Sequence, residues 1–137
     1  MSGTLKEYDP REVIIEWGGI NLNEGIAEGT FITIARTTRA FSLNVGGDGG
    51  GTRVRSHNRS GVIEVTLRAG SATNAKLSDR AKEDENGTSH VESLFIKDFS
   101  GDTLHDAPQA FLDGPPDDEK GTEEGTRVWR LLCLDLN

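Results

Sequence analysis

The sequence predicts a mainly β protein, a β-barrel or sandwich of about eight strands with one flanking α-helix. Apolar and polar residues alternate with a period of two along much of the chain, which is typical of strands with one buried face. Turn signals separate these runs at roughly the 8–12-residue spacing of sandwiches and barrels. The 17 glycines among 137 residues favour many tight turns. Without a visible repeat or linker, residues 1–137 are predicted to form a single domain.

The first half of the chain contains most of the predicted strands. These are residues 13–17, 20–22, 31–36, 41–45, 52–56 and 62–68. Gly18-Gly19 predicts a hairpin turn between the first two, because both positions tolerate positive φ. Residues 41–45 alternate, so we expect this strand to have one buried and one wetter side. In residues 62–68, the three aliphatic side chains of Ile63, Val65 and Leu67 are expected to share a buried face.

One convincing helix is predicted over residues 71–86. The Ser71 hydroxyl can cap its first turn by accepting a hydrogen bond from a free backbone N–H. A narrow inward stripe follows at helical spacing, formed by Thr73, Leu77 and Ala81. Asn86-Gly87 is a reasonable end, since glycine readily adopts the left-handed conformation. The helix should therefore lie against the flank of the sheet.

The second half returns to strands at residues 91–96, 104–112 and 127–136. Pro108 places the middle strand near a sheet edge or at a bulge, because proline donates no ladder hydrogen bond. Residues 114–125 are rich in Pro, Asp and Glu and are predicted to form a mobile acidic loop. Cys133 lies within an apolar run and is expected to be a small buried side chain.

The candidate chemical motifs are weak. The glycines of residues 46–51 lack the Gly-Lys-Ser/Thr ending of a phosphate loop, and a strand follows them rather than a helix. The three histidines His57, His90 and His105 are far apart, and the acidic run at residues 117–119 lacks the alternating pattern of a calcium loop. We therefore predict no catalytic, cofactor-binding or metal-binding residue, no cofactor and no enzyme activity.

Charge and hydropathy restrict the partners further. With 15 Lys+Arg and 23 Asp+Glu the net charge is −8, which argues against a protein that holds nucleic acid through its phosphates. The local basic patch of Arg53, Arg55 and Arg59 is better suited to contact an acidic neighbour. No apolar stretch approaches the ~18 residues of a membrane span, and the first residues do not read as a signal peptide.

Several short segments together resemble the tail tube proteins of contractile-tailed bacteriophages, in order over nearly the whole chain. The matching segments are Tyr8-Asp9-Pro10, Trp17-Gly18-Gly19-Ile20, residues 25–32, Val45-Gly46-Gly47-Asp48-Gly49, Arg59-Ser60-Gly61, residues 73–78, Asp98-Phe99-Ser100-Gly101 and Arg127-Val128-Trp129. The run of glycines at positions 49–51 departs from the family pattern. The family fold implied is a β-barrel or sandwich with a flanking helix, similar to the tube protein of type VI secretion systems.

The resemblance implies a structural virion protein located in the phage tail and assembled in the cytoplasm of the host bacterium. Its subunits would form six-membered rings that stack into the inner tail tube, surrounded by a sheath and bounded by baseplate and tail terminator proteins. Viral DNA would pass through the lumen without specific binding. Two alternatives remain at this point: the tube subunit of a related contractile device, such as a secretion system or a phage-tail-like bacteriocin, and a small β-sandwich ligand-binding module.

For a tube subunit, two segments are candidate contacts between copies: the N-terminal arm, residues 1–10, and the glycine-rich hairpin loop, residues 46–61. The candidate residues are Tyr8, Asp9, Gly46, Gly47, Asp48, Gly49, Arg53, Arg55 and Arg59. Both segments are expected to become ordered on assembly. The net charge also predicts a bore with more Asp and Glu than Lys and Arg, so that DNA slides rather than binds.

Overall fold

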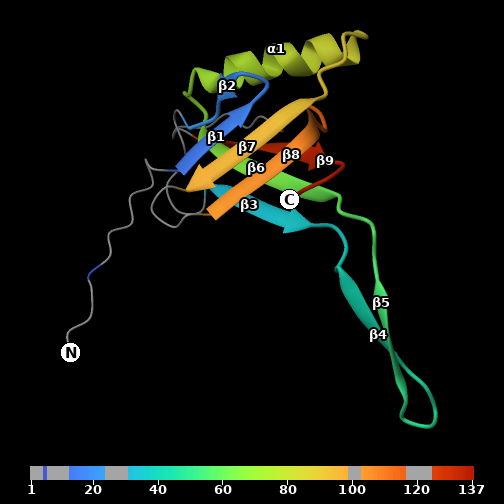
Figure 1. Ribbon diagram of the computed structural model, residues 1–137. Coiled ribbons are helices and arrows are strands. Elements are labelled where there is room, and N and C mark those ends of the chain that lie inside the picture. Colours follow the sequence, from blue (N-terminus) through green and yellow to red (C-terminus); the bar gives the residue numbers. More distant parts are fainter. Residues whose placement is uncertain (1–4, 6–12, 24–30, 99–102, 117–124) are drawn as a thin grey trace.

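The computed structural model describes residues 5, 13–23, 31–98, 103–116 and 125–137 (Figure 1). Its strands are β1 (Val13–Trp17), β2 (Ile20–Asn21), β3 (Ile32–Arg36), β4 (Phe41–Val45), β5 (Gly51–Arg55), β6 (Gly61–Arg68), β7 (Glu92–Asp98), β8 (Thr103–Leu112) and β9 (Thr126–Cys133). The helix α1 spans Thr73–Glu85. Every strand pairing is antiparallel. The prediction of a mainly β sandwich with one flanking helix is confirmed, with nine strands described in place of about eight.

Seven strands form one sheet in the order β2-β1-β7-β8-β9-β6-β3. The strand β8 connects its two halves, because residues up to Ala110 pair with β7 and the last three, from Ala110 to Leu112, pair with β9. The β7–β8 register shifts opposite the segment that contains Pro108, so the predicted bulge is confirmed. The alternative, an edge position, is wrong because β8 lies inside the sheet.

A single hydrophobic core joins the inner faces of the strands to the helix. Ile63, Val65 and Leu67 are fully buried, as the alternation predicts, and Trp17 and Trp129 are the largest buried side chains. Other core members are Val13, Ile15, Ile20, Leu22, Leu77, Ala81, Leu94, Ile96, Ala107, Ala110, Leu112, Leu131, Cys133 and Leu136. The burial of Cys133 confirms its interpretation as a small core residue.

The last strand ends earlier than predicted, at Cys133 rather than at residue 136. After it the chain bends, leaving Leu134 exposed, and Leu136 enters the core beside Gly61. The Leu136 N–H donates to the Arg59 carbonyl oxygen (2.8 Å), so the bend is held by the backbone. A Cβ at Gly61 would lie 2.9 Å from the Ala35 carbonyl oxygen, and this close approach explains why a residue without a side chain occupies position 61.

The predicted Gly18-Gly19 hairpin turn is present between β1 and β2. The two glycines have φ of 56° and 82°, as a two-residue turn with positive φ at both positions requires. A Cβ at Gly18 would also meet the ends of the Glu92 and Arg80 side chains, which would have to shift to admit it.

The helix α1 begins two residues later than predicted and ends one residue earlier, at Thr73 and Glu85. Ala72 rather than Ser71 occupies the cap position, although the Ser71 hydroxyl accepts a hydrogen bond from the Thr73 N–H (3.3 Å). The inward stripe is confirmed, since Thr73, Leu77 and Ala81 are buried together with Asn74. The Asn74 amide oxygen accepts a hydrogen bond from the Trp129 indole N–H (2.8 Å), which ties the start of the helix to the core.

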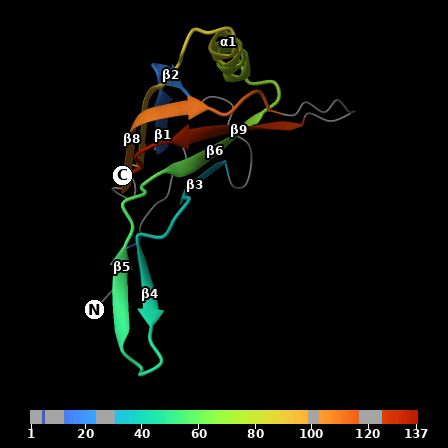
Figure 2. The same ribbon diagram turned by 90° about the vertical axis from the view of Figure 1, so that its right-hand side faces the viewer.

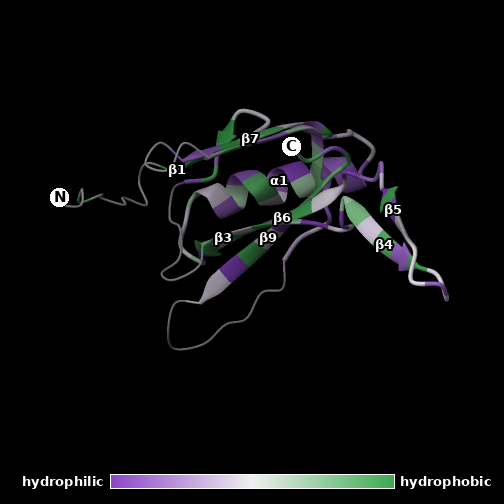
Figure 3. Cartoon of the chain, turned by 60° about the horizontal axis from the view of Figure 1, so that its bottom comes forward, coloured by the Kyte–Doolittle hydropathy of each residue, from purple (hydrophilic) through white to green (hydrophobic). Residues whose placement is uncertain are grey.

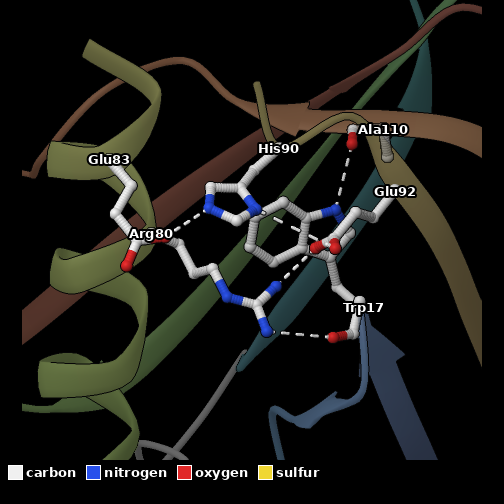
Figure 4. Close-up of polar contacts among 7 residues, drawn as sticks. Trp17, Arg80, Glu83, His90, Glu92 and Ala110 are labelled. Atoms are coloured by element: carbon white, nitrogen blue, oxygen red, sulfur yellow. Dashed lines mark hydrogen bonds and ion pairs between the residues drawn. The ribbon is translucent and has the colours of Figure 1, made fainter. Parts of the chain in front are cut away.

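A cluster of polar contacts fixes the helix above the sheet (Figure 4). Arg80 forms an ion pair with Glu92 of β7 and donates to the Gly18 carbonyl oxygen (3.2 Å). The Trp17 indole N–H donates to the Ala110 carbonyl oxygen (3.0 Å), and the Arg80 guanidinium lies 5.8 Å from the Trp17 ring centroid. His90 forms a hydrogen bond with Glu83. The cluster therefore connects α1 to β1, β7 and β8.

Candidate assembly interface

The hairpin formed by β4 and β5 projects away from the sandwich, on the side opposite α1 (Figures 1 and 2). The two strands pair only with each other and form a separate two-stranded sheet. All ten of their residues are exposed. The expectation that residues 41–45 have one buried side is therefore wrong for the single chain, because no part of the core reaches this hairpin.

The strand register divides the hairpin into two different faces. Phe41 lies opposite Arg55, Leu43 opposite Arg53 and Val45 opposite Gly51. Side chains directly opposite one another point to the same side of a sheet. One face therefore combines three apolar side chains with two arginines, and we call these residues the Phe41 face. The other face carries Ser42, Asn44, Thr52 and Val54.

The Phe41 face is strongly exposed. Leu43 is 69% exposed, Val45 64% and Phe41 43%. Figure 3 shows hydrophobic residues along β4, outside the main sheet. The Arg53 guanidinium lies 3.8 Å from the centroid of the Phe41 ring and that of Arg55 lies 5.4 Å from it, so the aromatic ring holds two positive charges on the same face. Within the described part of the chain, neither arginine forms an ion pair.

The glycine-rich segment forms the tip of this hairpin. The Gly46 N–H donates to the Gly50 carbonyl oxygen (2.8 Å), and the Gly49 N–H donates to the Gly46 carbonyl oxygen (3.0 Å). The Asp48 carboxylate accepts a hydrogen bond from the Gly50 N–H (2.9 Å), and Gly49 has a φ of 85°. This tip is a hydrogen-bonded turn, and no bound group is needed to explain its glycines.

The base of the hairpin is held by several polar contacts. Arg59 lies 3.7 Å from Asp135, and the Thr37 and Ser60 hydroxyls form a hydrogen bond of 2.7 Å. Arg36 donates to the Leu136 carbonyl oxygen through two nitrogens, at 3.0 and 3.3 Å. Of the predicted contact residues, Arg53 and Arg55 lie on the projecting strands, whereas Arg59 lies at this base.

Tyr8 and Asp9 fall outside the described residues, as does most of the predicted N-terminal arm and the central part of the acidic loop. Of the predicted residues that the structure describes, those from Gly46 to Arg55 come together in the hairpin, and Arg59 lies at its base. Sequence reasoning missed the apolar members Phe41, Leu43 and Val45 as contact residues. Their alternation was visible, but it was assigned to the core of the same chain.

The free cysteine Cys133 lies buried in the core. Burial raises the pKa of the Cys133 thiol to about 11, so the thiol is protonated at neutral pH. No group of three or more His, Cys, Asp or Glu within the described ranges is placed to hold a metal ion. Across the same residues, no helix has the length and apolar character needed to cross a membrane.

No family model and no curated protein matches the sequence. Its fold is similar to that of the anti-feeding prophage cap, a tube-terminating cap, with 11% identity and a TM-score of 0.57 over 100% of this chain and 93% of the other. A chain in the sheath/tube terminator of the PVC extracellular contractile injection system gives 12% identity and a TM-score of 0.61 over 91% of both chains. A chain in the PVC sheath-tube complex in the extended state has 13% sequence identity and a TM-score of 0.57, over 91% of this chain and 86% of that chain. This chain thus has a fold found in contractile injection systems.

Proposed function

We propose that this chain is the tube-forming subunit of a contractile tail, with six copies in each ring and rings stacked into the inner tube. Two findings support the proposal: the fold is shared with chains of contractile injection systems over nearly its whole length, and one hairpin projects from the sandwich with an uncovered apolar face.

The Phe41 face is the observation that carries the proposal. An isolated two-stranded hairpin is at best marginally stable in water, and exposed apolar faces mark interaction surfaces. Leu43 and Val45 pack little against their own chain, since about two thirds of each residue is exposed. A subunit that must join identical copies requires such a surface, whereas a ligand-binding module requires a pocket lined by aromatic side chains.

In this function the chain acts with other structural proteins of the tail rather than on a substrate. The sheath would surround the tube, and baseplate and terminator proteins would close its ends. DNA would pass through the lumen without specific binding, which suits a subunit of net charge −8. The assembled protein would be part of the virion tail, built in the cytoplasm of the host. A secretion system or a phage-tail-like bacteriocin would use the same subunit design without DNA.

A tube-terminating cap is the second candidate, and one specific observation favours it. Two of the similar structures are a tube-terminating cap and a sheath/tube terminator. Such a protein would form one closing ring and would bind the end of a tube made by another protein.

Negative-stain electron microscopy of the purified protein over a range of concentrations separates these functions. Tubes support the tube subunit, and isolated rings that never stack support the cap. A monomer at every concentration contradicts both and favours a binding module. Deleting Gly47 and Gly49 to shorten the tip should prevent tube growth while circular dichroism still shows a folded protein. Tubes of normal length from this variant would show that the tip makes no contact.

A further inference from the structure

The charge of this chain is unevenly distributed. Residues 36–60 contain five arginines and one aspartate, a net charge of +4. Because the net charge of the whole chain is −8, the remaining 112 residues have a net charge of −12. These 25 residues include the whole hairpin and both of its connections to the sandwich. One end of the subunit is therefore basic, while the rest of the chain is strongly acidic.

A groove of about 500 Å³ lies on the sandwich between the end of α1 and strands β8 and β9. Its apolar part includes Val91, which is 49% exposed, and Phe111, which is 37% exposed. Phe111 lies opposite Leu132 in the β8–β9 register, so these two side chains form one apolar pair on the same side of the sheet.

Three acidic residues also line this groove. Asp84 and Glu85 come from the last turn of α1, and Asp113 follows β8. Asp113 also lies 3.3 Å from Arg130, whereas neither Asp84 nor Glu85 forms an ion pair with another described residue. The groove thus combines exposed apolar side chains with negative charge, and the contacts of Arg80 hold its helical wall in place.

We infer that the acidic groove of one copy receives the Phe41 face of the next copy. The two surfaces are complementary in composition: Phe41, Leu43 and Val45 would cover Val91, Phe111 and Leu132, and Arg53 and Arg55 would approach Asp84 and Glu85. This inference rests on the proposed function, because it names the surface that the hairpin binds within the assembly.

The positions of the two surfaces fit a contact that repeats. The hairpin leaves the sandwich on the side away from α1, whereas the groove is bounded by the end of that helix (Figures 1 and 2). Two different patches on one subunit give a head-to-tail contact, which closes into a ring or continues as a filament. An open head-to-tail dimer leaves one hairpin and one groove uncovered, so further copies can add to it.

Charge reversal tests the pairing. The variant R53E/R55E has an acidic hairpin and an acidic groove, whereas D84R/E85R has a basic hairpin and a basic groove. Each variant alone should assemble only at a critical concentration at least about tenfold higher than that of the unmodified chain, because like charges then meet at the contact. An equimolar mixture of the two should assemble again, since each hairpin then finds a groove of opposite charge in the other variant. The chain that carries all four substitutions should also assemble.

Sedimentation and electron microscopy provide the readouts, with circular dichroism to verify folding. R68E/K76E and E16K/D79K are matched controls that change the net charge equally at exposed positions away from both surfaces, and they should assemble like the unmodified chain. If D84R/E85R is unfolded, D84N/E85Q replaces it and should assemble more weakly than the unmodified chain. Failure of the unmodified chain to assemble contradicts the proposed function. Normal assembly of the groove variants, or no recovery in the mixture, contradicts this inference alone.

Discussion

Replacing Leu43 and Val45 together by threonine tests whether the Phe41 face stabilises the assembly. Threonine has the β-branched shape that strands favour, but it carries a hydroxyl group and only one methyl group, so each substitution reduces the apolar surface. About two thirds of each side chain is exposed in the single chain, and complete burial of such a side chain contributes about 2 kcal/mol. The double variant should therefore lose about 2 kcal/mol per contact, since threonine retains one methyl group. This corresponds to roughly a 30-fold higher critical concentration.

The critical concentration can be measured by light scattering across a dilution series. Val54→Thr is the matched control, because Val54 is 41% exposed on the opposite face of the same hairpin. This substitution should change the critical concentration little. The free energy of unfolding of the dilute protein should stay within about 0.5 kcal/mol for both variants, as is usual for exposed positions. If the double variant assembled at the original concentration, or the control were equally impaired, this face would not be the contact.

Further predictions concern stability and the assembled tube. Asn74→Ala should lower the free energy of unfolding by about 2–3 kcal/mol in urea titrations, since it leaves the buried Trp129 indole N–H without its acceptor. Gly61→Ala should lower the free energy of unfolding by about 1–3 kcal/mol in the same assay, because the alanine Cβ would meet the Ala35 carbonyl oxygen. The raised pKa of Cys133 stabilises the native state fully below pH 9, and this contribution should disappear as the pH rises towards 11, with Cys133→Ala lacking that part of the pH dependence. A cryo-electron microscopy map of the tube should show more Asp and Glu than Lys and Arg facing the axis.

The fold could be predicted because its strands obey local rules. The inner face of β6 alternates without exception, and Gly18-Gly19 specifies a turn that few other dipeptides can form. The seven-strand order could not be predicted in the same way. The strand β8 changes partner from β7 to β9 at Ala110, and this depends on how distant segments pack rather than on any local pattern.

The candidate interface was predictable only in part. The glycines at the tip and the arginines behind it stood out in composition, whereas the alternation of β4 was assigned to the core. Alternation shows that one face of a strand needs cover, but it does not identify the molecule that supplies this cover. The groove combines Val91, Phe111 and Asp84 from three separate segments, so no sequence window contains its signal.

The proposed contact would also let an acidic subunit assemble with itself. A net charge of −8 on every copy opposes close packing, and this repulsion grows as copies accumulate. In the proposed assembly, the charge of +4 in residues 36–60 would provide attraction at one end of each copy and confine it to contacts that bring this end against an acidic body. Other encounters meet like charges and are disfavoured. Since exposed charges are screened within ~10 Å at 0.1 M salt, added salt should weaken this discrimination between contacts more than the apolar attraction within the correct one.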